Sequence, residues 1–234
     1  MPEFPPGVRV GVAVPAAGHG RRMGGARKPF LELAGEPLLA HALRPFLADD
    51  RVVAVAVAVS ADDVSSARSW VEALDPRIAV VAGGATRSDS VAAAVGRLPV
   101  DLRVIVGDAG GRPLGAAGGV ERCVAAGAGG AGAVAGWGAA ETVLEVGGDG
   151  GMVRTPDRSK VWHAQTPQGF PADVLRSALA DPEARALATD DAALVEAVGL
   201  PVVMVEGAPD NLKVTRPEDL PVAEILLARR RGGP

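Results

Sequence analysis

The residues best suited to chemistry form a small, basic segment near the start of the chain. Residues 15–24 read PAAGHGRRMG, and Lys28 follows a few positions later. Small residues at the carboxyl end of a strand let backbone N–H groups approach an anion closely, while the Arg22 guanidinium and the Lys28 ammonium supply countercharge. The segment therefore predicts a polyphosphate site.

Other interpretations of this segment compete with a polyphosphate site. A dinucleotide-binding fold is disfavoured because Met23 replaces the expected third glycine. The strand that should supply a ribose-binding acid also ends near Ser60, too far along the chain. A Walker phosphate loop is disfavoured because its Gly-Lys-Ser/Thr sequence is missing. The remaining alternative is a solvated turn whose arginines lie on the surface.

Two further segments that could bind a ligand or take part in catalysis follow expected strands. Residues 83–91 read GGATRSDSV and open a helix, and an N-cap at Ser88 or Asp89 would explain much of this segment without any function. Asp108 ends the expected strand 104–106, at the edge where open α/β sheets place their ligands. Its carboxylate could hold Mg²⁺ or orient a substrate hydroxyl, or it could simply end a strand at the surface.

Three later segments carry polar side chains, and each alone is weaker evidence: 155–158, 162–168 and 210–215. We expect Trp162 to lie in the core, because aromatic residues make up only 3% of the chain. Lys213, which stands just before a helix cap, could be solvated.

These residues need a scaffold, and the hydrophobic pattern predicts one of alternating strands and helices. Short Val-rich runs alternate with amphipathic stretches, as in parallel sheets joined by crossover helices. The run 52–59 contains only Val and Ala, which predicts a central strand buried on both faces. Strands are expected at 8–14, 52–59, 78–82, 104–106, 131–135 and 202–205.

Two helices are well marked. Ser60 can cap the first, whose apolar face steps by three, four and three residues. That face consists of Val64, Ala67, Val71 and Leu74. The last helix opens at 215–218, where Thr215 can cap and Glu218 can reach back. Its apolar face consists of Leu220, Ala223 and Leu227.

The domain organisation is simple apart from one segment. Between about residues 139 and 165 the sequence becomes glycine-rich and β-prone, with turn signals at 147–151, which predicts an inserted hairpin or arm. No repeat or long linker divides the chain, so we expect one domain over residues 1–234. The expected fold class is α/β, with a mostly parallel twisted sheet and helices on both faces.

Composition and charge exclude several classes of protein. The 234 residues are 48% hydrophobic and 22% charged, so the chain can bury a core and is not compositionally disordered. With a formal net charge of −4, the chain lacks the excess of basic residues that is typical of nucleic-acid-binding proteins. The uncharged stretch 123–140 is rich in glycine and too weakly hydrophobic for a membrane helix.

Cysteine and histidine usage indicates a reducing compartment. The single cysteine, Cys123, cannot form an internal disulfide, and three scattered histidines offer no zinc-binding spacing. Residues 1–6 lack the basic and apolar regions of a signal peptide. We therefore expect a cytoplasmic protein with no membrane or nucleic-acid partner.

In their order and at their separations, the chemistry-bearing segments resemble one family. They are PAAGHGRRMG with KPFL, GGATRSDSV, GDAGGRP, DRSKVWHAQTPQGF, TDDAAL and DNLKVTRPEDL, spread from about Val8 to Glu224. This set resembles the 2-C-methyl-D-erythritol 4-phosphate cytidylyltransferases of the non-mevalonate isoprenoid pathway. The two longest segments are too long for a chance similarity.

The resemblance implies a Rossmann-like α/β fold and a cytoplasmic homodimer in which an extended arm embraces the partner subunit. It implies that CTP reacts with a polyol phosphate to give a CDP-polyol and pyrophosphate, with Mg²⁺ as the cofactor.

The resemblance also implies roles for individual residues of this sequence. The nucleotide would be contacted by Ala16, Ala17, Gly18, Gly83, Arg87 and Ser90. Catalytic charge would come from Arg22, Lys28, Lys213 and Arg158. The acceptor would be surrounded by Asp108, Arg112, Thr142, Thr166 and Thr189. Thr142 and Arg158 would be offered across the dimer by the arm, and Asp108 is also the candidate metal ligand.

Such a reaction fits the residue types found. A phosphate monoester is already a competent nucleophile at neutral pH, so no Ser, Cys or His nucleophile is required. Catalysis reduces to positioning two anions and to charge stabilisation by Arg22, Lys28, Lys213 and Mg²⁺. Losing one such fixed cation should cost about 3 kcal/mol, roughly a hundredfold in rate.

The sequence departs from the family's pattern in three places. The usual HDAARP reads GDAGGRP over 107–113, so Gly107 replaces a histidine and an extra residue separates Asp108 from Arg112. The arm's usual Asp-Thr-x-Lys reads ETVL over 141–144, and the usual Pro-Lys-Gln reads RKP over 27–29. Ribitol 5-phosphate is therefore an alternative acceptor. A degraded, nucleotide-binding regulatory dimer and a dinucleotide oxidoreductase are alternatives of other classes.

Overall fold

A seven-stranded sheet forms the centre of the computed structural model, which describes residues 7–18, 27 and 30–232. Its strands are β1 (Val10–Pro15), β4 (Val52–Val59), β5 (Ile78–Ala82), β6 (Val104–Gly107), β7 (Gly132–Gly138), β10 (Trp162–Pro171) and β11 (Val202–Glu206). Six of them were predicted from the Val-rich runs, with ends that differ by at most three residues. The α/β fold class is confirmed.

The strand order is β11-β7-β10-β6-β1-β4-β5, and every neighbouring pair is parallel except the two that involve β10. Strand β10 was not predicted, because Pro167 and Gly169 interrupt its pattern and proline cannot donate to a sheet ladder. Its register shifts between Ala164 and Gln168, on either side of that proline.

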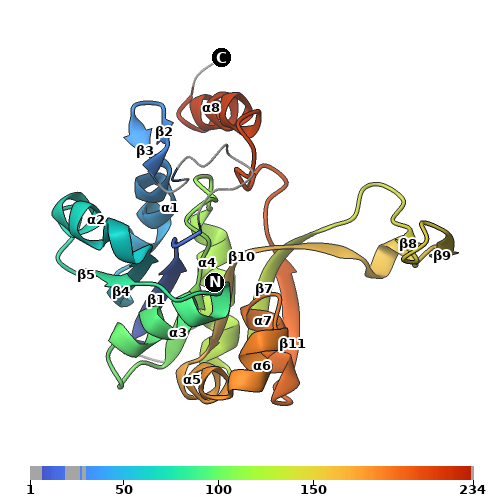
Figure 1. Cartoon of the computed structure of the whole chain (residues 1–234), viewed down its shortest axis with the longest axis horizontal. Coiled ribbons are helices and arrows are strands. Elements are labelled where there is room, and N and C mark those ends of the chain that lie inside the picture. The colour runs from blue at the N-terminus through green and yellow to red at the C-terminus, as the bar shows by residue number, and fades with distance from the viewer. Residues whose placement is uncertain (1–6, 19–26, 28–29, 233–234) are drawn as a thin grey trace.

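Helices cover both faces of the sheet (Figure 1). They are α1 (Leu38–Leu47), α2 (Val64–Val71), α3 (Arg87–Arg97), α4 (Ala117–Ala128), α5 (Ala172–Ala180), α6 (Pro182–Leu187), α7 (Asp191–Ala197) and α8 (Asp219–Arg230). Helices α1, α2 and α4 contribute to one buried cluster, whereas α3, α5 and α7 contribute to the other.

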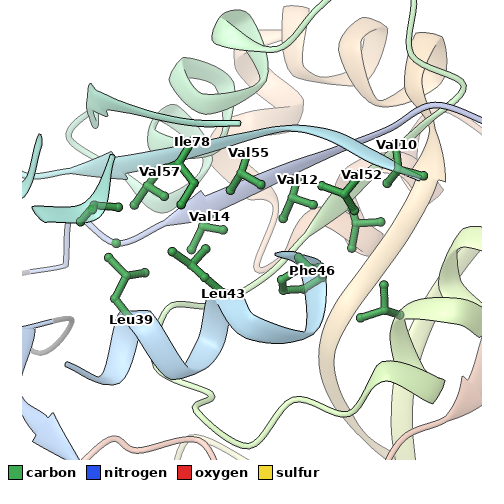
Figure 2. Close-up of a cluster of buried hydrophobic side chains, with 14 of the residues drawn as sticks. Val10, Val12, Val14, Leu39, Leu43, Phe46, Val52, Val55, Val57 and Ile78 are labelled. Atoms are coloured by element: carbon green, nitrogen blue, oxygen red, sulfur yellow. The ribbon is translucent and has the colours of Figure 1, made fainter. Parts of the chain in front are cut away.

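The alternation of Val and Ala along the strands determines the two faces. In β4, Val55, Val57 and Val59 join the cluster with α1 and α2, while Ala56 and Ala58 join the cluster with α3. Successive side chains of a strand point to opposite faces, so Ala56 and Ala58 lie on the face that α3 covers. Figure 2 shows the larger face, where strand valines lie over the α1 side chains Leu39, Leu43 and Phe46.

Two short hairpins complete the chain. The first, β2 (Glu32–Leu33) with β3 (Glu36–Pro37), packs with α8 around Leu33, Leu38 and Ala223. The second, β8 (Glu145–Val146) with β9 (Met152–Arg154), lies in the segment that we call the arm, residues 139–161. Figure 1 shows the arm projecting away from the sheet and its helices. No helix among the described residues is long and apolar enough to cross a membrane.

The helix caps differ from those predicted. The Ser60 side chain makes no capping hydrogen bond, because a 3₁₀ turn (Ala61–Asp63) separates it from α2. Thr86, rather than Ser88 or Asp89, caps α3. Helix α8 begins at Asp219, whose carboxylate accepts hydrogen bonds from the Thr215 backbone N–H at 2.6 Å and hydroxyl at 2.9 Å.

Candidate active site

Four chain segments that are distant in sequence line one cavity of about 310 Å³, which we call the edge cavity. It lies where β1, β5 and β6 end, at the carboxyl edge that binds ligands in open α/β sheets. Its lining residues are Pro15–Gly18, Gly84–Arg87, Ser90, Ala109–Gly111 and Lys213.

The end of β1 supplies small residues and a close backbone approach. Ala16 donates its backbone N–H to the Ala58 carbonyl at 2.7 Å, which keeps the chain beside β4 beyond the last strand residue. Gly83 lies behind this segment, since a Cβ there would be 2.6 Å from the Ala17 Cβ and 2.8 Å from the Ser90 Oγ. Glycine at position 83 therefore lets the ends of β1 and β5 meet.

The β5–α3 turn directs a helix N-terminus toward the edge cavity. Thr86 Oγ1 accepts the Asp89 backbone N–H at 3.0 Å, and the Asp89 carboxylate accepts the Thr86 N–H at 3.2 Å. Ser90 Oγ accepts the Gly84 N–H at 3.1 Å and donates to the Thr86 carbonyl at 3.0 Å. Backbone N–H groups at a helix N-terminus favour an anion, so this turn suits a phosphate or an acidic group.

Asp108 follows β6 and is only 4% exposed. Burial raises the pKa of this carboxyl to about 7, although hydrogen bonds from Thr166 and Ala109 and the charges of Arg112 and Arg87 act in the opposite direction. A nearby cation would favour the ionised form. Asp108 is therefore a carboxylate that suits a cationic ligand at the edge of the sheet.

A network of backbone contacts holds the loop that carries Lys213. The Arg112 guanidinium donates to the Asn211 carbonyl at 2.6 Å, and the Asn211 side-chain amide donates to the Thr166 carbonyl at 2.9 Å. Val214 donates its N–H to the Gly111 carbonyl at 2.9 Å. Lys213 is thus fixed next to the β6–α4 turn, where it lines the edge cavity.

Arg87 joins the edge cavity to a second part of the chain. Its two terminal nitrogens donate to the two carboxylate oxygens of Asp191 at 2.7 and 3.0 Å. Asp191 is 2% exposed and begins α7. Asp191 lies in the segment TDDAAL but was not among the predicted site residues, because its only local signal is an acidic pair that is equally typical of a helix cap.

The arm residues lie elsewhere. Arg158 donates to the Ala140 carbonyl at 3.1 Å and lines a second, open cavity of about 850 Å³ with Trp137 and Trp162. Thr142 is exposed on the arm. Trp162 was expected in the core, but it is 42% exposed at the base of the arm, so that prediction is wrong.

The structure brings together most, but not all, of the sequence-predicted site. Six predicted residues line the edge cavity: Ala16, Ala17, Gly18, Arg87, Ser90 and Lys213. Gly83, Asp108, Thr166 and Arg112 adjoin it through the contacts described above. Thr189 is exposed and lines neither cavity. Arg22 and Lys28 lie outside the described residues.

The edge cavity presents backbone N–H groups, an arginine and a lysine, which can bind a polyanion. Within the described part of the chain, no group of three His, Cys, Asp or Glu side chains could hold a metal ion.

Comparisons with known proteins agree on one family. The family model described as 2-C-methyl-D-erythritol 4-phosphate cytidylyltransferase matches residues 10–229. A protein of that name from Symbiobacterium thermophilum is 43% identical over 229 residues, covering 94% of this chain and 93% of its own. Another, from Parasynechococcus marenigrum, is 39% identical, covering 93% of this chain and 97% of its own.

Solved structures give the same result. The 2-C-methyl-D-erythritol 4-phosphate cytidylyltransferase from Thermus thermophilus superposes with a TM-score of 0.74 at 32% identity, covering 95% of this chain and 98% of its own. The 4-diphosphocytidyl-2C-methyl-D-erythritol synthase from Anaerococcus prevotii has a TM-score of 0.84 at 24% identity, covering 95% and 97%, and supports the fold alone.

Proposed function

The chain belongs to the 2-C-methyl-D-erythritol 4-phosphate cytidylyltransferase family, and from this premise we propose how its residues transfer CMP from CTP to 2-C-methyl-D-erythritol 4-phosphate. The enzyme is a CTP-dependent nucleotidyltransferase of isoprenoid precursor synthesis. An acceptor phosphate oxygen attacks the α-phosphorus of CTP. The bond from that phosphorus to the oxygen bridging the β-phosphorus breaks, and pyrophosphate leaves with the electron pair.

One observation supports this assignment of the site most strongly. Lys213 lines the same cavity as Gly18 and the turn before α3, although these segments are far apart in the sequence. Ala16, Ala17, Gly18, Gly83, Arg87 and Ser90 form the proposed nucleotide site. Small residues at the β1 end leave room for the nucleotide, and Lys213 supplies positive charge where two anions must meet.

The acceptor side of the site is formed by Asp108, Arg112 and Thr166. The Nε–H of Arg112 is buried and has no hydrogen-bond partner among the described residues, so the guanidinium keeps an unused donor. Because an arginine presents several donors, it can hold the acceptor phosphate while keeping its bond to Asn211. Arg22 and Lys28 complete the proposed set of catalytic cations.

The residues fit Mg²⁺ in the way that phosphate-bound Mg²⁺ is commonly held, by one carboxylate with phosphate oxygens and water. Asp108 is the proposed protein ligand, since burial raises the pKa of its carboxyl and a bound cation would favour the ionised form. When bound, Mg²⁺ would neutralise phosphate charge and so favour attack on the α-phosphorus.

The arm gives a reason to propose a homodimer. It projects from the subunit and exposes apolar side chains at Leu144, Val146, Met152 and Val153. A second copy would cover these side chains, and the arm would deliver Thr142 and Arg158 to the partner's acceptor site. Thr189 is proposed to contact the acceptor as well. We also propose a cytoplasmic location, because CTP is an intracellular metabolite.

An assay of pyrophosphate release tests the function. We expect release only when CTP, 2-C-methyl-D-erythritol 4-phosphate and Mg²⁺ are all present, and loss of activity when a chelator removes the metal. Faster turnover of ribitol 5-phosphate would overturn the choice of acceptor. Binding of CTP by calorimetry without turnover of either acceptor would instead favour a degraded regulatory protein.

A further inference from the structure

Arg87 and Asp191 form an ion pair in the wall of the edge cavity. Arg87 lines the cavity and its side chain is 35% exposed, whereas the Asp191 side chain is 2% exposed. The two hydrogen bonds, at 2.7 and 3.0 Å, match the planar fork of a guanidinium to a carboxylate. They use two of the five N–H donors of an arginine, so the guanidinium keeps donors for a ligand.

The backbone on either side of Asp191 is held as well, through Asp190 and Gln168. The Asp190 carboxylate accepts the Ala193 N–H at 2.9 Å and the Gln168 side-chain amide at 2.9 Å. The Gln168 side-chain oxygen in turn accepts the Ala192 N–H at 3.1 Å. The first turn of α7 is therefore attached to β10, which fixes the backbone that carries Asp191.

Gly107 makes the approach of Asp191 to the sheet possible. A Cβ at position 107 would lie 2.4 Å from the Asp191 Oδ2, closer than two atoms in contact can come. The same Asp191 Oδ2 accepts a hydrogen bond from Arg87, so a side chain at position 107 would compete with that contact. Three positions far apart in the sequence thus specify one guanidinium orientation.

We propose that Asp191 is a positioning residue for nucleotide binding: through its two hydrogen bonds it holds the Arg87 guanidinium toward CTP in the edge cavity, and Gly107 provides the space. This inference rests on the proposed nucleotide site and deepens it. A long arginine side chain loses conformational freedom when it is held in one orientation. Asp191 orders Arg87 before the nucleotide binds, so this loss of conformational entropy does not reduce the affinity for CTP.

The first test is Asp191→Asn, with steady-state kinetics for both substrates. We expect the KM for CTP to rise about ten- to thirtyfold, while kcat and the KM for the acceptor change less than threefold. Asp75→Asn is the matched control, because Asp75 also forms a paired contact with an arginine, Arg77, at 2.9 and 2.8 Å, but at the opposite edge of the sheet. It should leave the KM for CTP unchanged.

Removing Arg87 distinguishes the proposed positioning role of Asp191 from a purely structural role. If Asp191 acts through Arg87, then Asp191→Asn added to Arg87→Ala should raise the KM for CTP less than twofold further. The double variant should also be more stable in thermal unfolding than Arg87→Ala alone, because that single variant leaves a buried carboxylate unpaired. Multiplicative effects on the KM would overturn the proposal.

Gly107→Ala gives an independent test that leaves both members of the pair in place. We expect the same selective rise in the KM for CTP as in Asp191→Asn, and no further rise in the Arg87→Ala background. Gly96→Ala is its control, since a Cβ at that position of α3 meets nothing within 4 Å. An unchanged KM for CTP in Gly107→Ala would contradict the proposal.

Calorimetry with Mg²⁺·CTP separates this inference from the proposed function. If the wild-type protein binds CTP but turns over no acceptor, the proposed reaction fails. Even then, weaker CTP binding by Asp191→Asn, with Asp75→Asn unchanged, would support the positioning role. If the wild-type protein does not bind CTP, both the proposed function and this inference are overturned.

Discussion

At the scale of single residues, the proposed reaction depends on positive charge in the edge cavity. Lys213 lines the edge cavity and lies in a loop that Arg112 and Asn211 hold, so its backbone needs little reordering during the reaction. Its removal should therefore affect the rate much more than the fold.

We expect Lys213→Ala to lower kcat/KM roughly a hundredfold, equivalent to about 3 kcal/mol of transition-state stabilisation. The free energy of unfolding should change by less than about 1 kcal/mol. Arg9→Ala is the control, since Arg9 is an exposed cation that precedes β1 at the opposite edge of the sheet. Equal activity of the two variants in pyrophosphate release would contradict this role.

The sequence could predict the residues whose environment is local. Ala16, Ala17 and Gly18 stand at the end of a recognisable strand, so their place at the sheet edge follows from the Val-rich run before them. Asp191 could not be assigned in this way. Its partner is 104 residues away, and the space that it needs depends on Gly107, which belongs to a third segment.

At the scale of elements, the Val-rich strands were predicted closely and the helix ends were not. A buried strand is determined by its own side chains, as in β4, where eight residues alternate only Val and Ala. A helix cap depends on which side-chain oxygen reaches a free N–H, and at α3 several neighbours compete. The cap is formed by Thr86 and Asp89, whose side chains each accept a hydrogen bond from the other's backbone N–H.

The connection between α2 and β5 allows a test of element packing by pH. Arg77 donates to the carbonyls of Leu47 and Val52 at 2.6 and 2.9 Å, and Asp75 orients it. The hydrogen bond from Arg77 lowers the pKa of Asp75 from 3.8 to about 2. Because the folded pKa lies below the unfolded one, this stabilisation is present above pH 4 and is lost as the pH falls toward 2.

We therefore expect Asp75→Asn to lower the free energy of unfolding by about 2 kcal/mol at pH 6. The difference from the wild-type protein should narrow as the pH falls from 4 toward 2, where the wild-type carboxyl becomes protonated. Urea unfolding at several pH values measures this. A difference that stays constant over the range would show that Asp75 does not act through its charge.

At the scale of the whole molecule, the arm exposes apolar side chains that nothing in the described part of the same subunit covers. Residues Val146, Met152 and Val153 are each more than half exposed, on a hairpin that projects from the body. The glycine-rich composition of residues 139–165 predicted a hairpin, whereas its contact with a partner subunit came only from the family resemblance and stays a prediction.

We expect Val153→Asp to weaken the proposed dimer, because a charge would be buried where an apolar side chain meets the partner subunit. Sedimentation velocity over a range of concentrations should show more monomer, and pyrophosphate release should fall in parallel. Val100→Asp is the control, because Val100 is 89% exposed in the connection between α3 and β6. A wild-type protein that sediments as a monomer would refute the dimer.

A crystal structure of the protein with CTP and Mg²⁺ tests the central claim most directly. We expect the nucleotide in the edge cavity, with Arg87 and Ser90 in contact with it and the Lys213 ammonium within reach of its phosphates. A nucleotide bound elsewhere on the protein, with the edge cavity closed to it, would contradict the account.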